Sequence, residues 1–167
     1  MIVVCGLARA QEQIDLHKIH SVIGILGPET AHPTYRNIAL RQHLRLTFND
    51  INEEAAGMKA ASADDVDLLL NFISAWDKKA PLLIHCWAGI SRSTASAFAA
   101  LCLLQPSVDE MELALKLRLA SPSATPNRLI IKHVDDRLGR KGRMLRAVDS
   151  IGRGANAYEG VPFILSL

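Results

Sequence analysis

The stretch LLIHCWAGISRS, residues 82–93, decides the fold expected for this 167-residue chain. Its first four residues, Leu82 to His85, form a short apolar run typical of a buried parallel strand, and a break at Lys78 to Pro81 precedes them. From about Ser91 to Leu104 the chain is rich in alanine and apolar on nearly all sides, which predicts a helix buried in the centre of the molecule. We therefore expect a strand, a tight loop and a buried helix in direct succession.

The five residues between Cys86 and Arg92 have a spacing with a mechanical meaning. A loop of this length can curl so that its backbone N–H groups point inward around a tetrahedral anion, and Gly89 permits the tight curvature. The following helix directs its N-terminus at the same spot, so its partial positive charge favours phosphate. Arg92 adds a planar fork that can bind two phosphate oxygens. The predicted phosphate-binding residues are Trp87, Ala88, Gly89, Ile90, Ser91 and Arg92.

The same loop favours Cys86 as a nucleophile, because a helix N-terminus and a nearby cation both stabilise a thiolate. Ser93 is close enough in sequence to donate a hydrogen bond to the sulfur and stabilise it as a leaving group. His85 is expected to order the loop from behind. The alternative is a chance match in which Cys86 is a small core residue, and it is disfavoured because five residue types all fall at suitable positions.

The pattern resembles the signature of the protein tyrosine and dual-specificity phosphatase superfamily, a His-Cys pair, five residues, and Arg followed by Ser or Thr. The stretch LTFNDI, residues 46–51, looks like the strand and loop that bring the family's general-acid aspartate. Asn127 after Pro126 looks like a structural position of the family, and the overall pattern is similar to the small bacterial members. The resemblance implies a cysteine-phosphatase fold and hydrolysis of phosphomonoesters through a phosphocysteine.

A leaving oxygen needs a proton, and a carboxylic acid on a mobile loop can supply it and later activate water. We expect this acid to be Asp50, which follows a predicted strand and precedes Cys86 in the order usual for the family. The competing carboxylates are Glu53, Glu54, Asp64 and Asp65. The last two are more typical of a helix start, where acidic side chains are favoured.

The rest of the chain predicts one layered domain. Short β-branched runs at Ile2 to Val4 and Val22 to Leu26 flank a helix-like segment, and His43 to Phe48 alternates as a strand does. Ser62 with Asp65 predicts a helix start, and further helices are expected after Ser107, whose spacing to Glu110 is that of a capping box, and from Pro126. We expect a single α/β domain over residues 1–167, with a central, mostly parallel sheet of four to five strands flanked by helices on both faces.

The composition excludes several classes of protein. Hydrophobic residues make up 49% and charged residues 22%, which is typical of a globular domain. The net charge of +2 does not suggest broad nucleic-acid binding. No apolar stretch approaches the ~20 residues needed to cross a bilayer, so no membrane insertion is expected. We expect a cytoplasmic monomer that binds phosphorylated proteins or peptides, and phosphate or similar oxyanions.

Three cysteines, Cys5, Cys86 and Cys102, are too few and too scattered for a disulfide framework. Cys5 and Cys102 are expected to be buried core residues, with a regulatory Cys5 to Cys86 disulfide as a minor hypothesis. The other histidines show no metal-ligand spacing, and no nucleotide fingerprint is complete, so neither a metal nor a cofactor is expected.

Three functions stay open at this point. The first is a phosphatase acting in proteins on phosphotyrosine, either alone or together with phosphoserine and phosphothreonine. The second is a phosphatase for phosphoinositides, inositol phosphates or nucleotides, disfavoured because the loop carries no cation beyond Arg92. The third is a catalytically silent phosphopeptide-binding module, disfavoured because Cys86 and Arg92 are both present. Trp87 is expected either to wall the pocket or to pack beneath the loop. Tyr35 and Arg36 are candidates to flank a phosphotyrosine ring, with the alternative that Tyr35 merely covers the core, as loop tyrosines often do.

Overall fold

The computed structural model describes residues 1–167 as a five-stranded sheet with helices on both faces. The strand order is β3-β2-β4-β1-β5. The strands are β1 (Ile2–Gly6), β2 (Ser21–Leu26), β3 (His43–Thr47), β4 (Leu82–Cys86) and β5 (Phe163–Leu165). The first four are parallel, and β5 pairs antiparallel with β1 at the edge. The predicted, mostly parallel sheet is confirmed.

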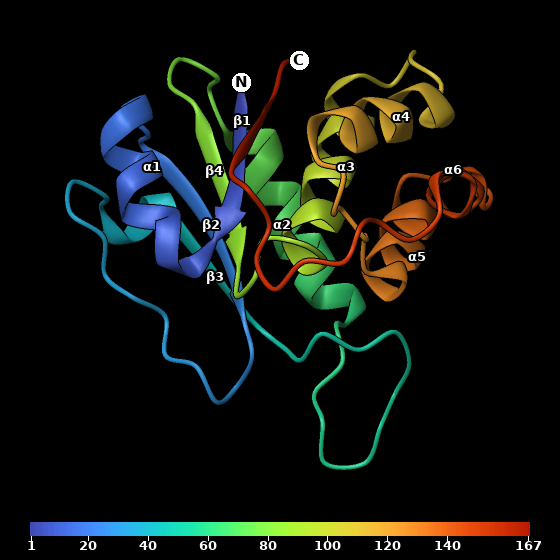
Figure 1. The fold of residues 1–167 in the computed structure, drawn as a ribbon, viewed down its shortest axis with the longest axis horizontal. Coiled ribbons are helices and arrows are strands. Elements are labelled where there is room, and N and C mark those ends of the chain that lie inside the picture. Colours follow the sequence, from blue (N-terminus) through green and yellow to red (C-terminus); the bar gives the residue numbers. More distant parts are fainter.

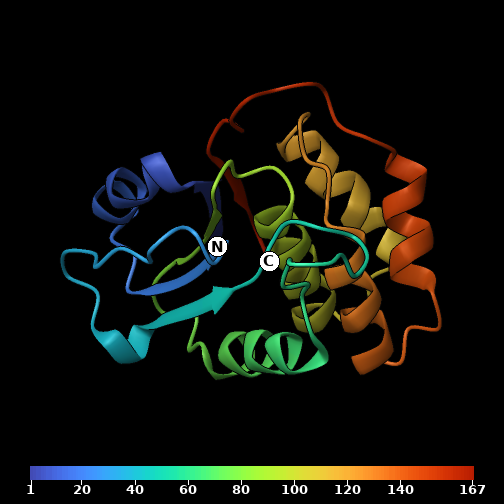
Figure 2. The same ribbon diagram turned by 90° about the horizontal axis from the view of Figure 1, so that it is seen from below.

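The two faces of the sheet are covered unequally (Figure 1). One helix, α1 (Ala10–His17), covers the first face, and the remaining helices lie on the second (Figure 1, Figure 2). These are α2 (Ala63–Ala75), α3 (Arg92–Leu104), α4 (Glu110–Ala120), α5 (Arg128–Arg137) and α6 (Arg143–Ile151). Short 3-10 turns at Leu7–Arg9 and Leu40–Gln42 precede α1 and β3. No helix is both long and apolar enough to span a bilayer.

Helix α3 is the centre of the larger core. Every residue from Arg92 to Cys102 is buried, because α3 is enclosed by the sheet and by its neighbouring helices. Small alanine side chains allow this close approach on all sides. The predicted central helix is therefore confirmed, and it begins at Arg92, directly after the loop.

The helix starts were predicted with mixed success. Ser62 and Asp65 form the expected capping box of α2. The N–H of Asp65 donates to Ser62 Oγ at 3.1 Å, and the N–H of Ser62 donates to Asp65 Oδ2 at 3.0 Å. The predicted start at Ser107 is wrong, because the Asp109 side chain accepts from the N–H of Met111 and caps α4 instead. Pro126 precedes the cap of α5 and is not its first residue, since Asn127 is the cap.

Three segments that are distant in the sequence meet at one end of the sheet, the end at which the parallel strands finish. The carboxyl ends of the parallel strands all meet at this edge, which faces the reader in Figure 2. There the loop after β4 lies beside the long connection from β3 to α2 and the segment that leads to β5. Cys86, the last residue of β4, lies at this edge.

Candidate active site

The loop between β4 and α3 has its carbonyl groups turned outward. Four of them, at residues 87, 88, 90 and 91, accept hydrogen bonds from other segments of the chain. The donors are the backbone N–H groups of Leu7, Gly160, Thr125 and Asn127, at 3.0, 2.8, 2.9 and 3.4 Å respectively. Because a trans peptide places C=O and N–H on opposite sides, each outward carbonyl turns the following N–H inward. The loop therefore presents a ring of inward donors, which is the arrangement expected for an anion cradle.

Gly89 meets two requirements in this loop. Its φ of +74° lies in the left-handed region, which side chains with a Cβ rarely adopt. A Cβ at this position would also lie 2.6 Å from the carbonyl carbon of Cys5 and from the nitrogen of Gly6. The loop thus packs directly on the end of β1, and only glycine fits there.

The sulfur of Cys86 accepts from the loop and contacts the start of α3. The N–H of Gly89 donates to Cys86 Sγ at 3.2 Å, and Ser93 Oγ lies 3.2 Å from the same sulfur. Cys86 is only 2% exposed, yet it lines a cleft of about 500 Å³ that opens at the surface. Ser93 thus lies beside the sulfur, as predicted from the sequence, and the N–H of Gly89 adds a second hydrogen-bond donor.

Arg92 is anchored at one end of its guanidinium group and unpaired at another. Nη1 donates to the carbonyl of Phe48 at 2.8 Å, which fixes the plane of the group beside the cleft. Nε is buried and has no hydrogen-bond partner, although Asp50 Oδ2 lies 3.8 Å away. A buried donor without a partner is costly, and a charged donor more so. An oxyanion in the cradle would supply the missing acceptor.

Asp50 has one oxygen fixed and the other available. Oδ1 accepts from Ser91 Oγ at 2.6 Å and from Asn127 Nδ2 at 2.8 Å, whereas Oδ2 has no hydrogen-bond donor and lies on the side of Arg92. The carboxylate lines the cleft together with Cys86. The orientation of the Asp50 carboxylate is therefore set by Ser91 and Asn127. The sequence predicted Ser91 as a phosphate-binding residue and Asn127 as a structural position.

The competing carboxylates lie elsewhere. Glu53 and Glu54 are exposed on the β3 to α2 connection, and neither lines the cleft. Asp64 and Asp65 lie in the first turn of α2, where Asp65 closes the capping box. The structure thus brings only Asp50, of the five candidates, to the edge of the cleft.

His85 lies behind the loop, on the side of α1. Its Nδ1 lies 3.4 Å from the carbonyl of Cys86, and its Nε2 is hydrogen-bonded to the Tyr35 hydroxyl at 2.9 Å. Burial lowers the pKa of His85 to about 3, so the imidazole is neutral. The expectation that Tyr35 and Arg36 flank a substrate ring is wrong, because Tyr35 is buried against His85 and Arg36 pairs with Asp15 at 2.7 Å.

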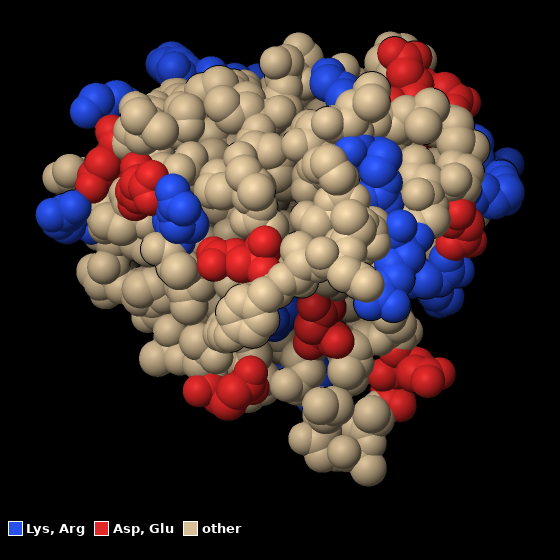
Figure 3. Space-filling view, viewed as in Figure 1, with Lys and Arg blue, Asp and Glu red and all other residues tan.

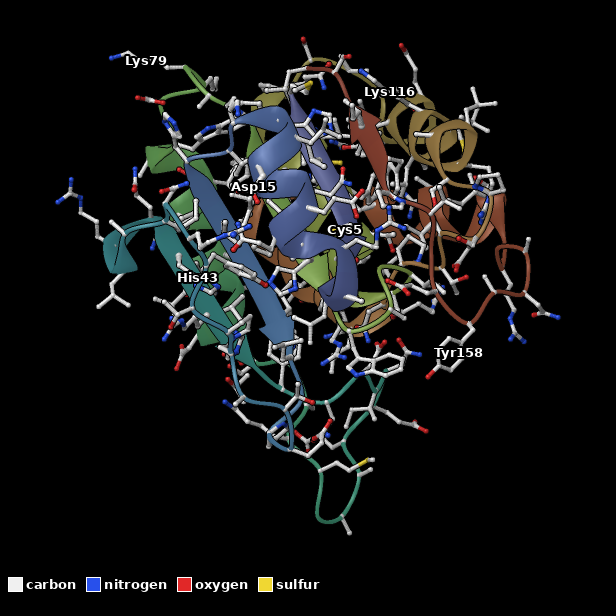
Figure 4. All side chains as sticks on the ribbon, turned by 60° about the vertical axis from the view of Figure 1, so that its left-hand side comes forward. Cys5, Asp15, His43, Lys79, Lys116 and Tyr158 are labelled. Carbon is white, nitrogen blue, oxygen red and sulfur yellow. The ribbon has the colours of Figure 1, made fainter.

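Two more histidines, His32 and His43, share this buried region with His85. A Cβ on Gly24 of β2 would lie 2.8 to 3.2 Å from a ring nitrogen of each of the three, so the glycine makes room for them. Burial also lowers the pKa of His43, to about 4 (His43 is labelled in Figure 4). No group of three or more His, Cys, Asp or Glu residues is arranged to hold a metal ion.

The other two cysteines are buried, and burial raises the pKa of both Cys5 and Cys102 to about 12. Cys5 belongs to the small core under α1, whereas Cys86 belongs to the large core on the other face. A direct disulfide between them would therefore require the loop or β1 to rearrange.

Trp87 forms part of the wall of the cleft, the first of the two places expected for it. It is 46% exposed and packs edge-to-face with Tyr158, with ring centroids 5.6 Å apart at 81°. Tyr158 projects from the segment before β5 and is 81% exposed (Figure 4). Sequence reasoning missed Tyr158, because it lies in an irregular segment with no periodicity and is far from the loop along the chain.

Comparison with solved structures identifies the fold. No protein-family model and no curated protein matches the chain. The crystal structure of DUSP15 aligns with a TM-score of 0.66 and 20% identity, covering 90% of this chain and 89% of that one. The chain has the dual-specificity phosphatase fold.

Two further structures share this dual-specificity phosphatase fold. Cydia pomonella PTP-2 phosphatase aligns with a TM-score of 0.63 and 17% identity, covering 81% of this chain and 84% of that one. The human tyrosine phosphatase-like serine/threonine/tyrosine-interacting protein aligns with a TM-score of 0.65 and 16% identity, covering 84% and 92%. The fold implied by the sequence signature is confirmed.

Proposed function

We propose that this protein is a cysteine-dependent phosphomonoesterase that acts on phosphotyrosine in proteins. The observation that carries the proposal is the environment of the Cys86 sulfur at the carboxyl edge of the sheet. One N–H and one hydroxyl lie 3.2 Å from it, and the guanidinium of Arg92 borders the same cleft with an unpaired Nε. These groups suit a nucleophile and a bound tetrahedral oxyanion at adjacent positions.

The first chemical step forms the sulfur–phosphorus bond. The Cys86 thiolate attacks phosphorus in line with the leaving oxygen, and the phosphorus–oxygen bond to that group breaks. The inward loop amides and Arg92 stabilise charge on the three equatorial oxygens. Asp50, in its acid form, gives its proton to the leaving oxygen through Oδ2, because Oδ1 is occupied by Ser91 and Asn127.

The second step returns the enzyme to its starting state. Asp50, now a carboxylate, accepts a proton from a water molecule that attacks the phosphocysteine. The sulfur–phosphorus bond breaks, phosphate leaves, and the sulfur departs as a thiolate. The Ser93 hydroxyl, 3.2 Å from the sulfur, stabilises that charge by donating a hydrogen bond.

The charge of the cleft supports a phosphoprotein over a highly phosphorylated small molecule. Glu29 and Asp50 line the cleft, and Arg92 is its only Lys or Arg. Extra phosphates would meet carboxylates here and no additional cations, so a polyanionic ligand such as an inositol phosphate is disfavoured. The wall of Trp87 and Tyr158 offers an aromatic surface to a phosphorylated side chain.

A binding module without catalysis is the second candidate. One protein of the same fold is named a phosphatase-like interacting protein. Both Cys86 and Arg92 are present in this chain and border one cleft, which supports catalysis.

We also propose that the protein acts as a monomer in a reducing cytoplasm, where its three cysteines remain thiols.

The test is hydrolysis of p-nitrophenyl phosphate and of a phosphotyrosine peptide, with chelator present, by the wild type, Cys86→Ser and Cys102→Ser. We expect activity that survives chelation, disappears in Cys86→Ser and persists in Cys102→Ser. Full activity in Cys86→Ser would rule out the mechanism. Phosphopeptide binding without turnover by the wild type would favour the binding module.

A further inference from the structure

A second hollow of about 480 Å³ adjoins the cleft that holds Cys86. Its wall is formed by the segment after α6, residues 153–158, together with Thr125 and the outer side of the loop. The residues common to both hollows are Ile90, Ser91, Ala157 and Tyr158. A ligand longer than a single phosphorylated side chain could therefore occupy both at once.

The segment that builds this hollow is fixed to the body of the protein along its length. Arg118 donates to the carbonyl of Gly152 at 2.8 Å, and the N–H of Gly154 donates to Thr125 Oγ1 at 3.1 Å. The N–H of Ala155 donates to the carbonyl of Pro122 at 2.9 Å, and the N–H of Gly160 donates to the carbonyl of Ala88 in the loop at 2.8 Å. The hollow is thus preorganised, and little conformational entropy would be lost when a ligand enters it.

Arg153 gives the second hollow a charge opposite in sign to that of the carboxylates in the first. It is the only charged residue of the lining, it is exposed, and it makes no hydrogen bond or ion pair within the chain. By contrast, Arg140 and Arg143 on the same half of the molecule both pair with the buried carboxylate of Glu110. Lys and Arg side chains gather on this side of the face in Figure 3, over the helices α5 and α6.

We propose that this hollow is a second substrate subsite, in which Arg153 binds an anionic group next to the phosphorylated residue of a peptide. The group is an acidic side-chain carboxylate or a second phosphate, since the guanidinium fork pairs with either. The Trp87 and Tyr158 rings stand at the boundary between the two hollows. The proposal rests on the proposed function and adds a sequence preference to it.

Binding to Cys86→Ser protein tests this without turnover. Three fluorescent phosphotyrosine peptides of equal length are compared by polarisation, with flanking glutamates, flanking alanines, or one flanking phosphoserine. We expect the glutamate peptide to bind about twofold to fivefold more tightly than the alanine peptide, the range for an exposed charged pair. Adding Arg153→Ala should remove that difference, and Arg153→Glu should reverse it.

The control is Arg41→Ala, because Arg41 is also exposed but lies in a different hollow, beside the start of β2. Arg41→Ala should leave unchanged the ratio of the dissociation constants of the alanine and glutamate peptides. For each anionic peptide, its affinity relative to the alanine peptide is compared between the Cys86→Ser protein and the same protein carrying Arg153→Ala. If neither relative affinity changes, the proposal is overturned. A loss confined to the phosphoserine peptide would identify phosphate as the anion.

The outcomes also separate this proposal from the proposed function. Absence of turnover by the wild type on every phosphoester would refute the enzyme activity, while the dependence of the ratio on Arg153 would stand. An active enzyme whose peptide preference ignores Arg153 would refute the subsite alone.

Discussion

The side-chain amide of Asn127 donates a 2.8 Å hydrogen bond to Oδ1 of Asp50, while its carbonyl oxygen accepts from the N–H groups of Leu129 and Ile130. One residue therefore caps α5 and orients the proposed general acid. Asn127→Ala should lower kcat by roughly tenfold, because a misplaced catalytic group slows the chemical step. It should also destabilise the fold by about 1 kcal/mol through loss of the cap.

The matched control for Asn127 is Asn52→Ala. Asn52 accepts from the N–H of Arg128, so its loss weakens the same helix start without contacting Asp50. Measured kcat and its pH profile should change in Asn127→Ala and remain near normal in Asn52→Ala. Equal kinetic effects of the two changes would show that Asn127 acts only through stability.

Removal of the Asp50 carboxyl should slow hydrolysis by about 10²–10⁴-fold, the usual contribution of a general acid. The loss should be larger for a phosphotyrosine peptide than for p-nitrophenyl phosphate, whose leaving group needs protonation less. Steady-state kinetics of Asp50→Ala, with Glu53→Ala and Glu54→Ala beside it, measure this directly. A near-normal rate in Asp50→Ala would transfer the role to one of the two glutamates.

Gly89→Ala should unfold more easily than wild type and lose activity, since the new methyl group meets β1 at 2.6 Å and φ is +74°. Gly139→Ala is a matched control, because φ is +63° there but no atom lies within 4 Å of the added Cβ. The conformational penalty alone is about 1–2 kcal/mol. Urea unfolding of both variants should show a clearly larger loss for Gly89→Ala, and equal losses would mean that the contact with β1 is unimportant.

Stability should fall on acidification below pH 6.5. Burial lowers the pKa of His85 to about 3 and of His43 to about 4, from an ordinary value near 6.5. Between the lowered pKa of each histidine and pH 6.5, the unfolded chain binds more protons than the folded one. The free energy of unfolding therefore decreases as the pH falls through this range. Each group contributes up to about 1.4 kcal/mol per pH unit.

Urea unfolding at pH 7, 6 and 5 measures this slope. His43→Gln removes one of the buried histidines whose pKa is lowered, so the stability of this variant should depend less steeply on pH than that of the wild type. Identical slopes in the two proteins would show that folding does not lower the pKa of His43.

The sequence was most informative where one segment decides its own structure. The β4 strand, the loop and α3 are contiguous, and their residue types satisfy local requirements of burial, curvature and helix start. Asp50 could be placed because it directly follows a recognisable strand. The Ser107 error arose between two nearby residues that can both cap a helix, which only the path of the turn decides.

The remaining parts of the site depend on contacts between distant segments. Tyr158 reaches Trp87 because the segment before β5 crosses the loop, and no local pattern in residues 152–162 indicates that path. Tyr35 was misplaced for the same reason, since the chain after β2 returns over the α1 face and buries the ring against His85. Such contacts follow from the topology of the whole sheet.

The four outward carbonyls of the loop have donors at residues 7, 125, 127 and 160, which span nearly the whole chain. The anion cradle is thus held by segments near both ends of the polypeptide, and we expect it not to form in a fragment that lacks either one. Its opening free energy should equal that of global unfolding, so the amides of Leu7 and Gly160 should be among the slowest to exchange with deuterium. We therefore expect catalytic competence to appear only when the whole domain has folded.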